Sequence, residues 1–206
     1  MNAPHDFGES LARSHSASDL PIWEGIYRQA FPSFLAMIDH RQDGEHQRAG
    51  IDRSVVLSNS KQILIDEKAR FRNRNGKVYD DIALEYWSDY ERRERGWVCK
   101  PLRCDFIAYA IVPLGKCYLL PTIQLQIAWT RFGPEWVKTN RYPRIETRNE
   151  FKGRRWTTIS RGIPPEVVFG AIGSALQYDF EPIGGDDSPF EVGQWVSEYE
   201  SAESLG

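Results

Sequence analysis

Two short apolar runs on either side of a polar turn predict a β-hairpin near residue 60. The first run covers residues 51–57 and ends at Ser58-Asn59-Ser60, a combination typical of turns. Residues 62–71 then read Gln-Ile-Leu-Ile-Asp-Glu-Lys-Ala-Arg-Phe, which suits a second strand. Because a short polar turn joins the two runs, we predict that they pair as an antiparallel hairpin.

Apolar residues at helical spacing mark three other segments. Residues 22–37 predict a helix that Pro32 kinks or divides, because proline lacks the backbone N–H that a helix interior needs. Residues 122–132 follow the same spacing, and Pro164-Pro165 begins a third helix with apolar positions as far as Leu176.

The remaining segments predict strands and one long loop. Residues 106–112 are apolar, as in a central strand buried on both faces, and residues 117–120 form a further strand. Residues 133–155 are basic with little periodicity and predict a loop, which leads to a short strand at 156–160. This mixture predicts an α/β (α+β) domain with a mixed β-sheet flanked by helices.

The composition favours one globular domain. The chain has 206 residues, 41% of them hydrophobic, and no apolar stretch of the ~18 to 20 residues that cross a bilayer. Residues 1–20 lack periodicity and the apolar run of a signal peptide. We expect a disordered arm at 1–20, a domain over 21–180 and an acidic tail over 181–206, in a soluble, cytoplasmic protein with no membrane contact.

The cysteines and histidines form no regular framework. Cys99, Cys104 and Cys117 are an odd number, and structural zinc usually needs four ligands at short paired spacings. All four histidines lie within the first 46 residues, away from the cysteines. We therefore expect buried free thiols rather than a zinc site.

Charge is unevenly distributed, although the net charge is only −3. Residues 61–161 hold 21 basic and 12 acidic side chains, a net charge of +9, whereas residues 162–206 hold nine acidic and no basic ones. A single charge run is most often a solvated face, but a long basic segment attracts the phosphates of nucleic acids. The acidic end either offsets that field or keeps the chain soluble.

Asp52, Asp66 and Lys68 carry the clearest chemistry. Side chains alternate along a strand, so Asp66 and Lys68 share one face and Glu67 points away. Asp52 lies 14 residues before Asp66 with a turn between them, so it can reach the same edge from the neighbouring strand. Two carboxylates supply oxygen ligands for a divalent cation, and a lysine can stabilise charge on a phosphate.

The acid-x-Lys tripeptide is weak evidence when taken alone. With 29 acidic residues and seven lysines, about one such tripeptide is expected by chance, and the chain has two. Glu150-Phe-Lys152 lies in a polar segment with no aspartate 10–20 residues upstream. Only Asp66-Glu-Lys68 follows a strand-like run and has a partner acid before it.

Gly50-Ile51-Asp52 followed by Ile65-Asp66-Glu67-Lys68 resembles the motif of the PD-(D/E)XK nuclease superfamily, with Ile51 in place of the proline. The resemblance implies a restriction-endonuclease-like core, in which an acid-bearing helix and the hairpin are followed by a helix and a strand. It implies that Asp52, Asp66 and the backbone carbonyl of Glu67 bind Mg²⁺ or Mn²⁺, and that Lys68 positions or activates water.

The same resemblance implies roles for other positions. Glu24 would take the place of the acid on the first helix, and Gln124 or Gln126 would occupy a later polar position. Glu85 is either an accessory acid near the metal or part of a structural ion pair.

Basic residues continue beyond Lys68 at alternate positions of the expected strand. If these residues share one face of the strand, they would follow a DNA backbone. If the strand lies at the edge of a sheet, their charges would instead discourage aggregation. The candidate nucleic-acid contacts are Arg70, Arg72, Arg74 and Lys77.

Together the patterns favour a metal-dependent nuclease that hydrolyses phosphodiester bonds in DNA. The sequence contains no Gly-x-Ser-x-Gly elbow, phosphate-binding glycine loop or dinucleotide fingerprint. The alternative is a catalytically inactive module of the same fold that binds nucleic acid, or a protein partner through its acidic C-terminal segment as an inhibitor or adaptor. A homodimer and a place in a larger nucleic-acid-processing complex both stay open.

Overall fold

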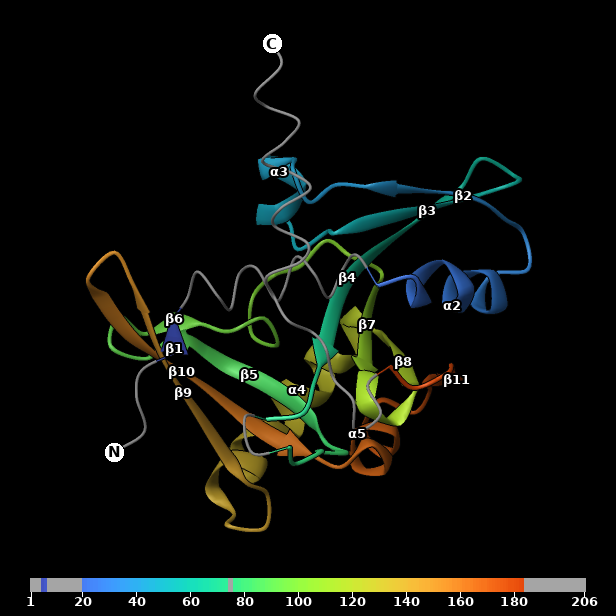
Figure 1. Cartoon of the computed structure of the whole chain (residues 1–206). Helices are drawn as coiled ribbons and strands as arrows, with labels where there is room; N and C mark the ends of the chain where they lie inside the picture. Colours follow the sequence, from blue (N-terminus) through green and yellow to red (C-terminus); the bar gives the residue numbers. More distant parts are fainter. Residues whose placement is uncertain (1–4, 7–19, 74–75, 184–206) are drawn as a thin grey trace.

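The chain forms two β-sheets with helices packed against them (Figure 1). This computed structural model describes residues 5–6, 20–73 and 76–183. Within these ranges, no helix combines the length and the apolar composition that crossing a membrane requires. The expected class, a mixed α/β fold with a mixed sheet flanked by helices, is confirmed.

The six-stranded sheet contains the predicted hairpin. Its order is β11-β8-β7-β4-β3-β2, so neighbours in space are mostly neighbours in the chain. β4 runs parallel to β7, and the other neighbouring pairs are antiparallel. The strands are β2 (Phe34–Asp39), β3 (Arg53–Leu57), β4 (Gln62–Arg70), β7 (Phe106–Ile111), β8 (Lys116–Pro121) and β11 (Leu176–Asp179).

The five-stranded sheet is built around a long hairpin of β9 and β10. Its order is β1-β9-β10-β5-β6, with β1 parallel to β9 and the other pairs antiparallel. The hairpin turns at Lys152 and Gly153, whose φ angles of 48° and 77° suit a two-residue turn. The strands are β1 (His5–Asp6), β5 (Ile82–Asp89), β6 (Glu94–Arg95), β9 (Arg144–Phe151) and β10 (Arg154–Ile163).

Two hydrophobic cores lie on opposite faces of the six-stranded sheet. Helix α2 buries Trp23, Ile26 and Tyr27 against one face. Helices α4 and α5 pack against the other face together with β5 and β10 of the second sheet. The helices are α2 (Ile22–Ala30), α3 (Gly44–Arg48), the short 3-10 helix η1 (Val112–Leu114), α4 (Thr122–Lys138) and α5 (Pro165–Ile172).

Several predicted elements are confirmed. The hairpin forms as β3 and β4, residues 106–111 form the buried strand β7, and a helix begins at Thr122. Cys104 and Cys117 are buried free thiols, and Cys99 is half-buried. Local turn and periodicity signals were therefore sufficient for these elements.

The predicted helix over 22–37 is wrong beyond Ala30. The backbone becomes extended at Phe31, before Pro32, and residues 34–39 pair with β3 as an edge strand. A register shift between Phe34 and Ala36 places an extra residue in β2. This bulge leaves Phe34 and Met37 packed on the same core, so their spacing of three imitates a helix.

The predicted loop at 133–155 is also wrong. Helix α4 continues to Lys138, and residues 144–151 form β9. A Cβ atom at Gly133 would lie 2.9 Å from the Trp129 ring, so the glycine lets this ring pack against its own helix.

The last predicted helix ends earlier than expected. α5 stops at Ile172 because Gly173 adopts a left-handed φ of 73°, and Leu176 begins β11 instead. Within the expected N-terminal arm, His5 and Asp6 form β1. The other residues of the arm up to 19, and the acidic tail from 184, lie outside the described residues.

Candidate active site

Asp66 and Lys68 lie on one face of β4, as strand alternation predicts. Their partners in β7 are Ile107 and Tyr109, which belong to the core shared with α4 and the second sheet. Glu67 faces the opposite core, beneath α2. The acid and the lysine of the motif therefore point toward the five-stranded sheet.

Asp52 reaches the same place because the pairing of β3 with β4 stops early. Among the described strands, β3 covers β4 only from Gln62 to Ile65, which leaves the edge beyond Ile65 open. The N–H of Asp52 donates to the carbonyl of Ile65 at 2.9 Å, and its Oδ2 accepts the N–H of Glu67 at 2.8 Å. The Asp52 side chain continues the ladder by one residue and is thereby held beside Asp66.

Asp52 and Asp66 meet in a site with little access to water. The Asp66 side chain is 5% exposed, and its Oδ1 lies 2.5 Å from Nζ of Lys68. Burial raises the pKa of Asp66 to about 7, Lys68 opposes this rise, and the hydrogen-bonded Asp52 carboxyl adds to it. Asp66 is buried and Asp52 is half-buried. A shared proton or a nearby cation stabilises two carboxyl groups in contact, and their oxygens suit Mg²⁺ or Mn²⁺.

Lys68 is enclosed by acids from three segments. Burial favours its neutral form, but the carboxylates of Asp66, Asp52 and Glu85 outweigh this effect and raise its pKa above the usual value. Glu85 reaches toward Lys68 from β5, and burial raises the pKa of Glu85 while Lys68 opposes the rise. These acids hold the Lys68 ammonium group as a positive charge beside Asp66.

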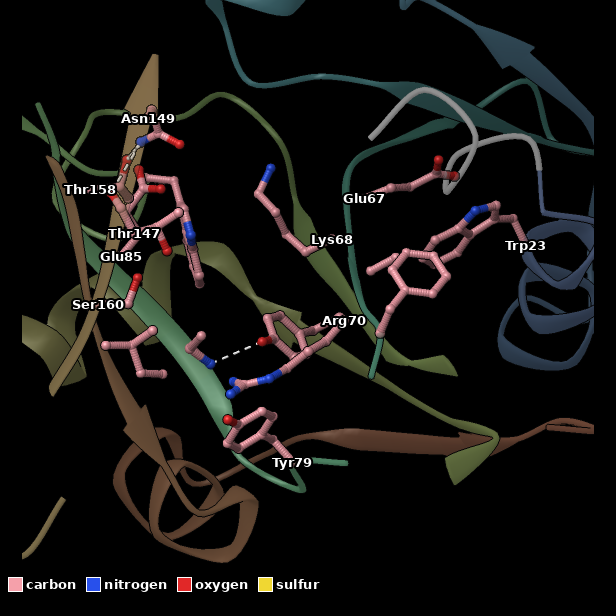
Figure 2. A pocket seen from close by; sticks show the side chains of 16 residues that line it. Trp23, Glu67, Lys68, Arg70, Tyr79, Glu85, Thr147, Asn149, Thr158 and Ser160 are labelled. Atoms are coloured by element: carbon pink, nitrogen blue, oxygen red, sulfur yellow. Dashed lines mark hydrogen bonds between the residues drawn. The ribbon is translucent and has the colours of Figure 1, made fainter. Parts of the chain in front are cut away.

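Lys68 projects into a cleft between the two sheets (Figure 2). The cleft has a volume of about 480 Å³, and the open edge of β4 forms one wall. On the far wall, Nδ2 of Asn149 donates to Oγ1 of Thr158 at 2.9 Å, so polar groups there are already ordered. The far wall consists of Glu85, Trp97, Thr147, Asn149, Thr158 and Ser160.

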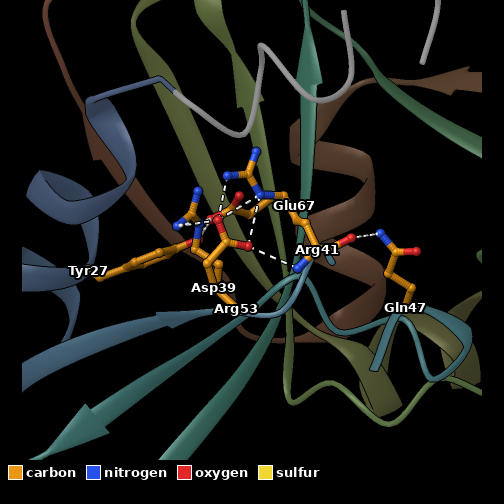
Figure 3. Close-up of polar contacts among 6 residues, drawn as sticks. All are labelled: Tyr27, Asp39, Arg41, Gln47, Arg53 and Glu67. Atoms are coloured by element: carbon orange, nitrogen blue, oxygen red, sulfur yellow. Dashed lines mark hydrogen bonds and ion pairs between the residues drawn. The ribbon is translucent and has the colours of Figure 1, made fainter. Parts of the chain in front are cut away.

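Glu67 belongs to a buried polar network on the other face of β4 (Figure 3). Its Oε1 accepts the Tyr27 hydroxyl at 2.8 Å and lies 2.8 Å from Nε of Arg53. Burial raises the pKa of Glu67 to about 7, against the opposing effect of Arg53. Because the N–H of Glu67 holds Asp52, this network also fixes the backbone beneath the site.

The structure does not bring Glu24, Gln124 or Gln126 to this cluster. Glu24 is exposed on α2, across the six-stranded sheet, and pairs with Arg28 at 2.6 Å. Gln124 is exposed on α4, and Gln126 donates to the backbone carbonyl of Lys100. The role that the resemblance implies for Glu24 is therefore corrected, and Glu85 of β5 is the third acid near Lys68.

The predicted row of basic residues does not share one face of a strand, because β4 ends at Arg70. Arg70 is largely buried and forms an ion pair with Asp81, which occupies its guanidinium. Arg72 and Lys77 are exposed beyond the strand, and Arg74 lies outside the described residues. Of this group, Arg72 and Lys77 are accessible to a phosphate backbone.

Sequence reasoning missed the polar residues on the far wall of the cleft. Thr147 and Asn149 lie in the segment predicted as a loop, yet they point into the cleft from β9. Charged and uncharged residues alternate strictly from Arg144 to Phe151, which is the period of a strand. That alternation was the signal that would have located this wall.

The raised pKa of Asp66 predicts how stability depends on pH. Between the ordinary pKa of 3.8 and about 7, the folded chain keeps a proton that the unfolded chain releases, so the free energy of unfolding falls as the pH rises. Asparagine resembles the protonated acid. Without divalent ions, we expect the stability of Asp66→Asn relative to the wild type to be roughly 1–3 kcal/mol greater at pH 8 than at pH 5.

Urea unfolding in chelator at both pH values measures this difference in the free energy of unfolding. Asp179→Asn is the matched control, because Asp179 is exposed on β11, and it should show no gain that depends on pH. A difference from the wild type of equal size at both pH values, or a variant relatively less stable at pH 8 than at pH 5, would mean that Asp66 is not protonated near neutrality.

Asp52, Asp66 and Lys68 belong to one hairpin, Glu85 comes from β5, and Lys68 and Glu85 both line the cleft. No family model matches the chain, and no curated protein or solved structure is significantly similar to it.

Proposed function

We propose that this chain is a metal-dependent nuclease that hydrolyses phosphodiester bonds in DNA, with a restriction-endonuclease-like core. The observation that carries the proposal is the contact of the buried Asp66 carboxyl group with that of the half-buried Asp52, with Lys68 beside them at the edge of a cleft. Asp52, Asp66 and the carbonyl of Glu67 would hold Mg²⁺ or Mn²⁺. When bound, such an ion lowers the pKa of water and neutralises charge on the phosphate.

The arrangement of the six-stranded sheet supports the proposed core. Helix α2 precedes the hairpin, β4 of the hairpin carries Asp66 and Lys68, and β4 lies beside the parallel strand β7. One element differs from the pattern that the resemblance implies. Between the hairpin and β7 the chain inserts β5 and β6, which join the second sheet in place of a helix. This insertion brings Glu85 and the far wall of the cleft to the site.

Lys68 would supply fixed positive charge to the reaction. Its ammonium group would donate hydrogen bonds to a phosphate oxygen or to the attacking water. Negative charge on the phosphate grows toward the transition state, so a cation already fixed at the cleft would lower the barrier. Asp66 holds the ammonium group in position at 2.5 Å.

The cleft would hold the nucleotide next to the scissile phosphate. Trp97 offers an aromatic face for a base, and the ordered amide and hydroxyl groups of Asn149 and Thr158 offer hydrogen bonds. The exposed Arg72 and Lys77 would contact phosphates farther along the strand.

The test is cleavage of labelled duplex, single-stranded and branched DNA, and of RNA, with Mg²⁺, with Mn²⁺ and with chelator. We expect DNA cleavage that requires either ion and stops when the ion is removed. Ca²⁺ is a useful fourth condition, because it binds oxygen ligands but has a larger, less rigid coordination shell than Mg²⁺.

The same experiment separates the catalytic proposal from its alternative. DNA binding that weakens with salt, without cleavage by either ion, would favour a catalytically inactive module of this fold. Absence of both binding and cleavage for all four substrates would contradict a nucleic-acid function.

A further inference from the structure

Two histidines and one aspartate converge between β2 and β3, away from the proposed catalytic acids. His40 follows β2, Asp43 caps α3, and His46 lies within α3. A ligand atom from each lies within 4.8 Å of the other two, and no other such trio of His, Cys, Asp or Glu occurs in the described part of the chain. The two imidazole rings are stacked, with centroids 4.0 Å apart.

Local hydrogen bonds fix the backbone from which these side chains project. Oδ1 of Asp43 accepts the N–H of Glu45 at 2.9 Å, and the N–H of Asp43 donates to the carbonyl of His40 at 2.8 Å. The N–H of Ile51 donates to the carbonyl of His46 at 3.0 Å. The three side chains therefore converge from positions that need no rearrangement of the backbone.

The donor set differs in kind from the Asp52–Asp66 pair. Imidazole nitrogens are preferred ligands of Zn²⁺, Ni²⁺ and Cu²⁺, whereas Mg²⁺ prefers oxygen ligands and retains water. One ring nitrogen of His40 has a polar neighbour outside the trio, as in sites whose ligands are oriented by a second contact, and one ring nitrogen of His46 lies beside the Asp43 carboxylate. Nε2 of His40 lies 2.7 Å from Oγ of Ser54, and Nδ1 of His46 lies 2.8 Å from Oδ2 of Asp43.

Binding would require only side-chain movement. A tetrahedral ion with bonds of about 2.0–2.1 Å needs ligand atoms roughly 3.3 Å apart, so the trio must contract and the rings must turn out of their stack. Both rings are only partly buried, which leaves room for this rotation. Three ligands from the chain would leave one coordination position for water.

We propose that His40, Asp43 and His46 bind one transition metal ion of the Zn²⁺ class, separately from Asp52 and Asp66. The N–H of His40 donates to the carbonyl of Asp52 at 2.8 Å, and Ile51, which precedes Asp52, bonds to His46. The ion joins the start of the β2–β3 connection to α3, and the backbone bonds of His40 and His46 carry this restraint to Ile51 and Asp52.

The test uses the full chain without a histidine tag, stripped of metal by chelator. Calorimetric titration with Zn²⁺ is expected to show one equivalent bound per chain, and Zn²⁺ should raise the melting temperature. Titration with Co²⁺ should produce visible d–d absorption without the near-ultraviolet charge-transfer band of thiolate ligands. That spectrum separates this site from binding by Cys99 or Cys104.

Variants decide whether these residues are the ligands. His40→Ala, His46→Ala and Asp43→Asn should each weaken Zn²⁺ binding at least about tenfold. Asparagine still caps a helix, so Asp43→Asn tests the ligand without removing the cap. His15→Ala and Asp66→Asn are controls that should retain the bound equivalent.

Three outcomes would overturn the proposal. The first is the absence of a stoichiometric Zn²⁺ equivalent in the wild-type chain. The second is unchanged binding in folded Asp43→Asn and in both histidine variants. The third is loss of the same equivalent in Asp66→Asn, which would place the ion at the catalytic acids.

Discussion

Replacing Lys68 with methionine is expected to lower metal-dependent DNA cleavage roughly 10²–10⁴-fold. Methionine keeps an unbranched apolar side chain but removes the ammonium group that lies 2.5 Å from Asp66. The loss should appear in kcat more than in KM, because the charge stabilises the transition state more than the bound substrate. Single-turnover cleavage of labelled DNA at saturating Mg²⁺ measures the chemical step directly.

Lys152→Met is the matched control for this substitution. Lys152 ends the second acid-x-Lys tripeptide, Glu150-Phe-Lys152, but it is exposed at the turn between β9 and β10. We expect this variant to cleave DNA at close to the wild-type rate. Circular dichroism and thermal unfolding in Mg²⁺ establish that both variants are folded. Equal rates for Lys68→Met and the wild type, or equal losses in both variants, would show that the site is assigned wrongly.

The convergence of Asp52, Asp66 and Lys68 was predictable because it depends on local rules. A polar turn sets the hairpin, and the period of two sets which side chains share a face. The structure also shows a detail that the periodicity of the sequence does not predict. The pairing of β3 ends at Ile65, and only this early end lets the Asp52 side chain bond to the N–H of Glu67.

Hydrophobic patterning predicted only part of the second sheet, the strand at 156–160 within β10. β9 exposes charged residues on one side and presents Thr147 and Asn149 to the cleft on the other, so it lacks the apolar face that usually reveals a strand. β9 is stabilised by its pairing along β10. Such backbone pairing produces no periodic pattern of apolar residues in the sequence. Strands that line polar clefts are hidden from hydrophobic patterning for this reason.

The third acid was misplaced because proximity in the fold does not follow order in the chain. Glu24 was chosen because its helix precedes the hairpin, but that helix packs on the face of β4 that carries Glu67. Glu85 lies on a strand of the other sheet and approaches Lys68 only because the sheets face each other. The cluster of His40, Asp43 and His46 was missed for a similar reason. It contains no cysteine, and the spacing of its residues matches no common zinc motif.

Replacing Arg53 with methionine is expected to lower the free energy of unfolding by about 3–5 kcal/mol. Arg53 lies 2.8 Å from Oε1 of Glu67, and the two side chains are 8% and 1% exposed. Without the guanidinium, the Glu67 carboxylate would lose its counter-ion in a place that water cannot reach. Glu67 should then hold a proton more tightly than in the wild type, so the loss should be larger at pH 8 than at pH 6.

Two further variants separate this buried pair from ion pairs in general. Arg155→Met removes a comparable contact, because Nε of Arg155 lies 2.7 Å from Glu150, but the Arg155 side chain is 73% exposed. That variant should lose about 0–1 kcal/mol. The double variant Arg53→Met, Glu67→Gln should recover most of the stability lost in Arg53→Met, because no buried charge then lacks a partner. Urea unfolding of all four proteins measures these changes in the free energy of unfolding. Equal losses for Arg53→Met and Arg155→Met would mean that burial of Glu67 does not make this pair essential.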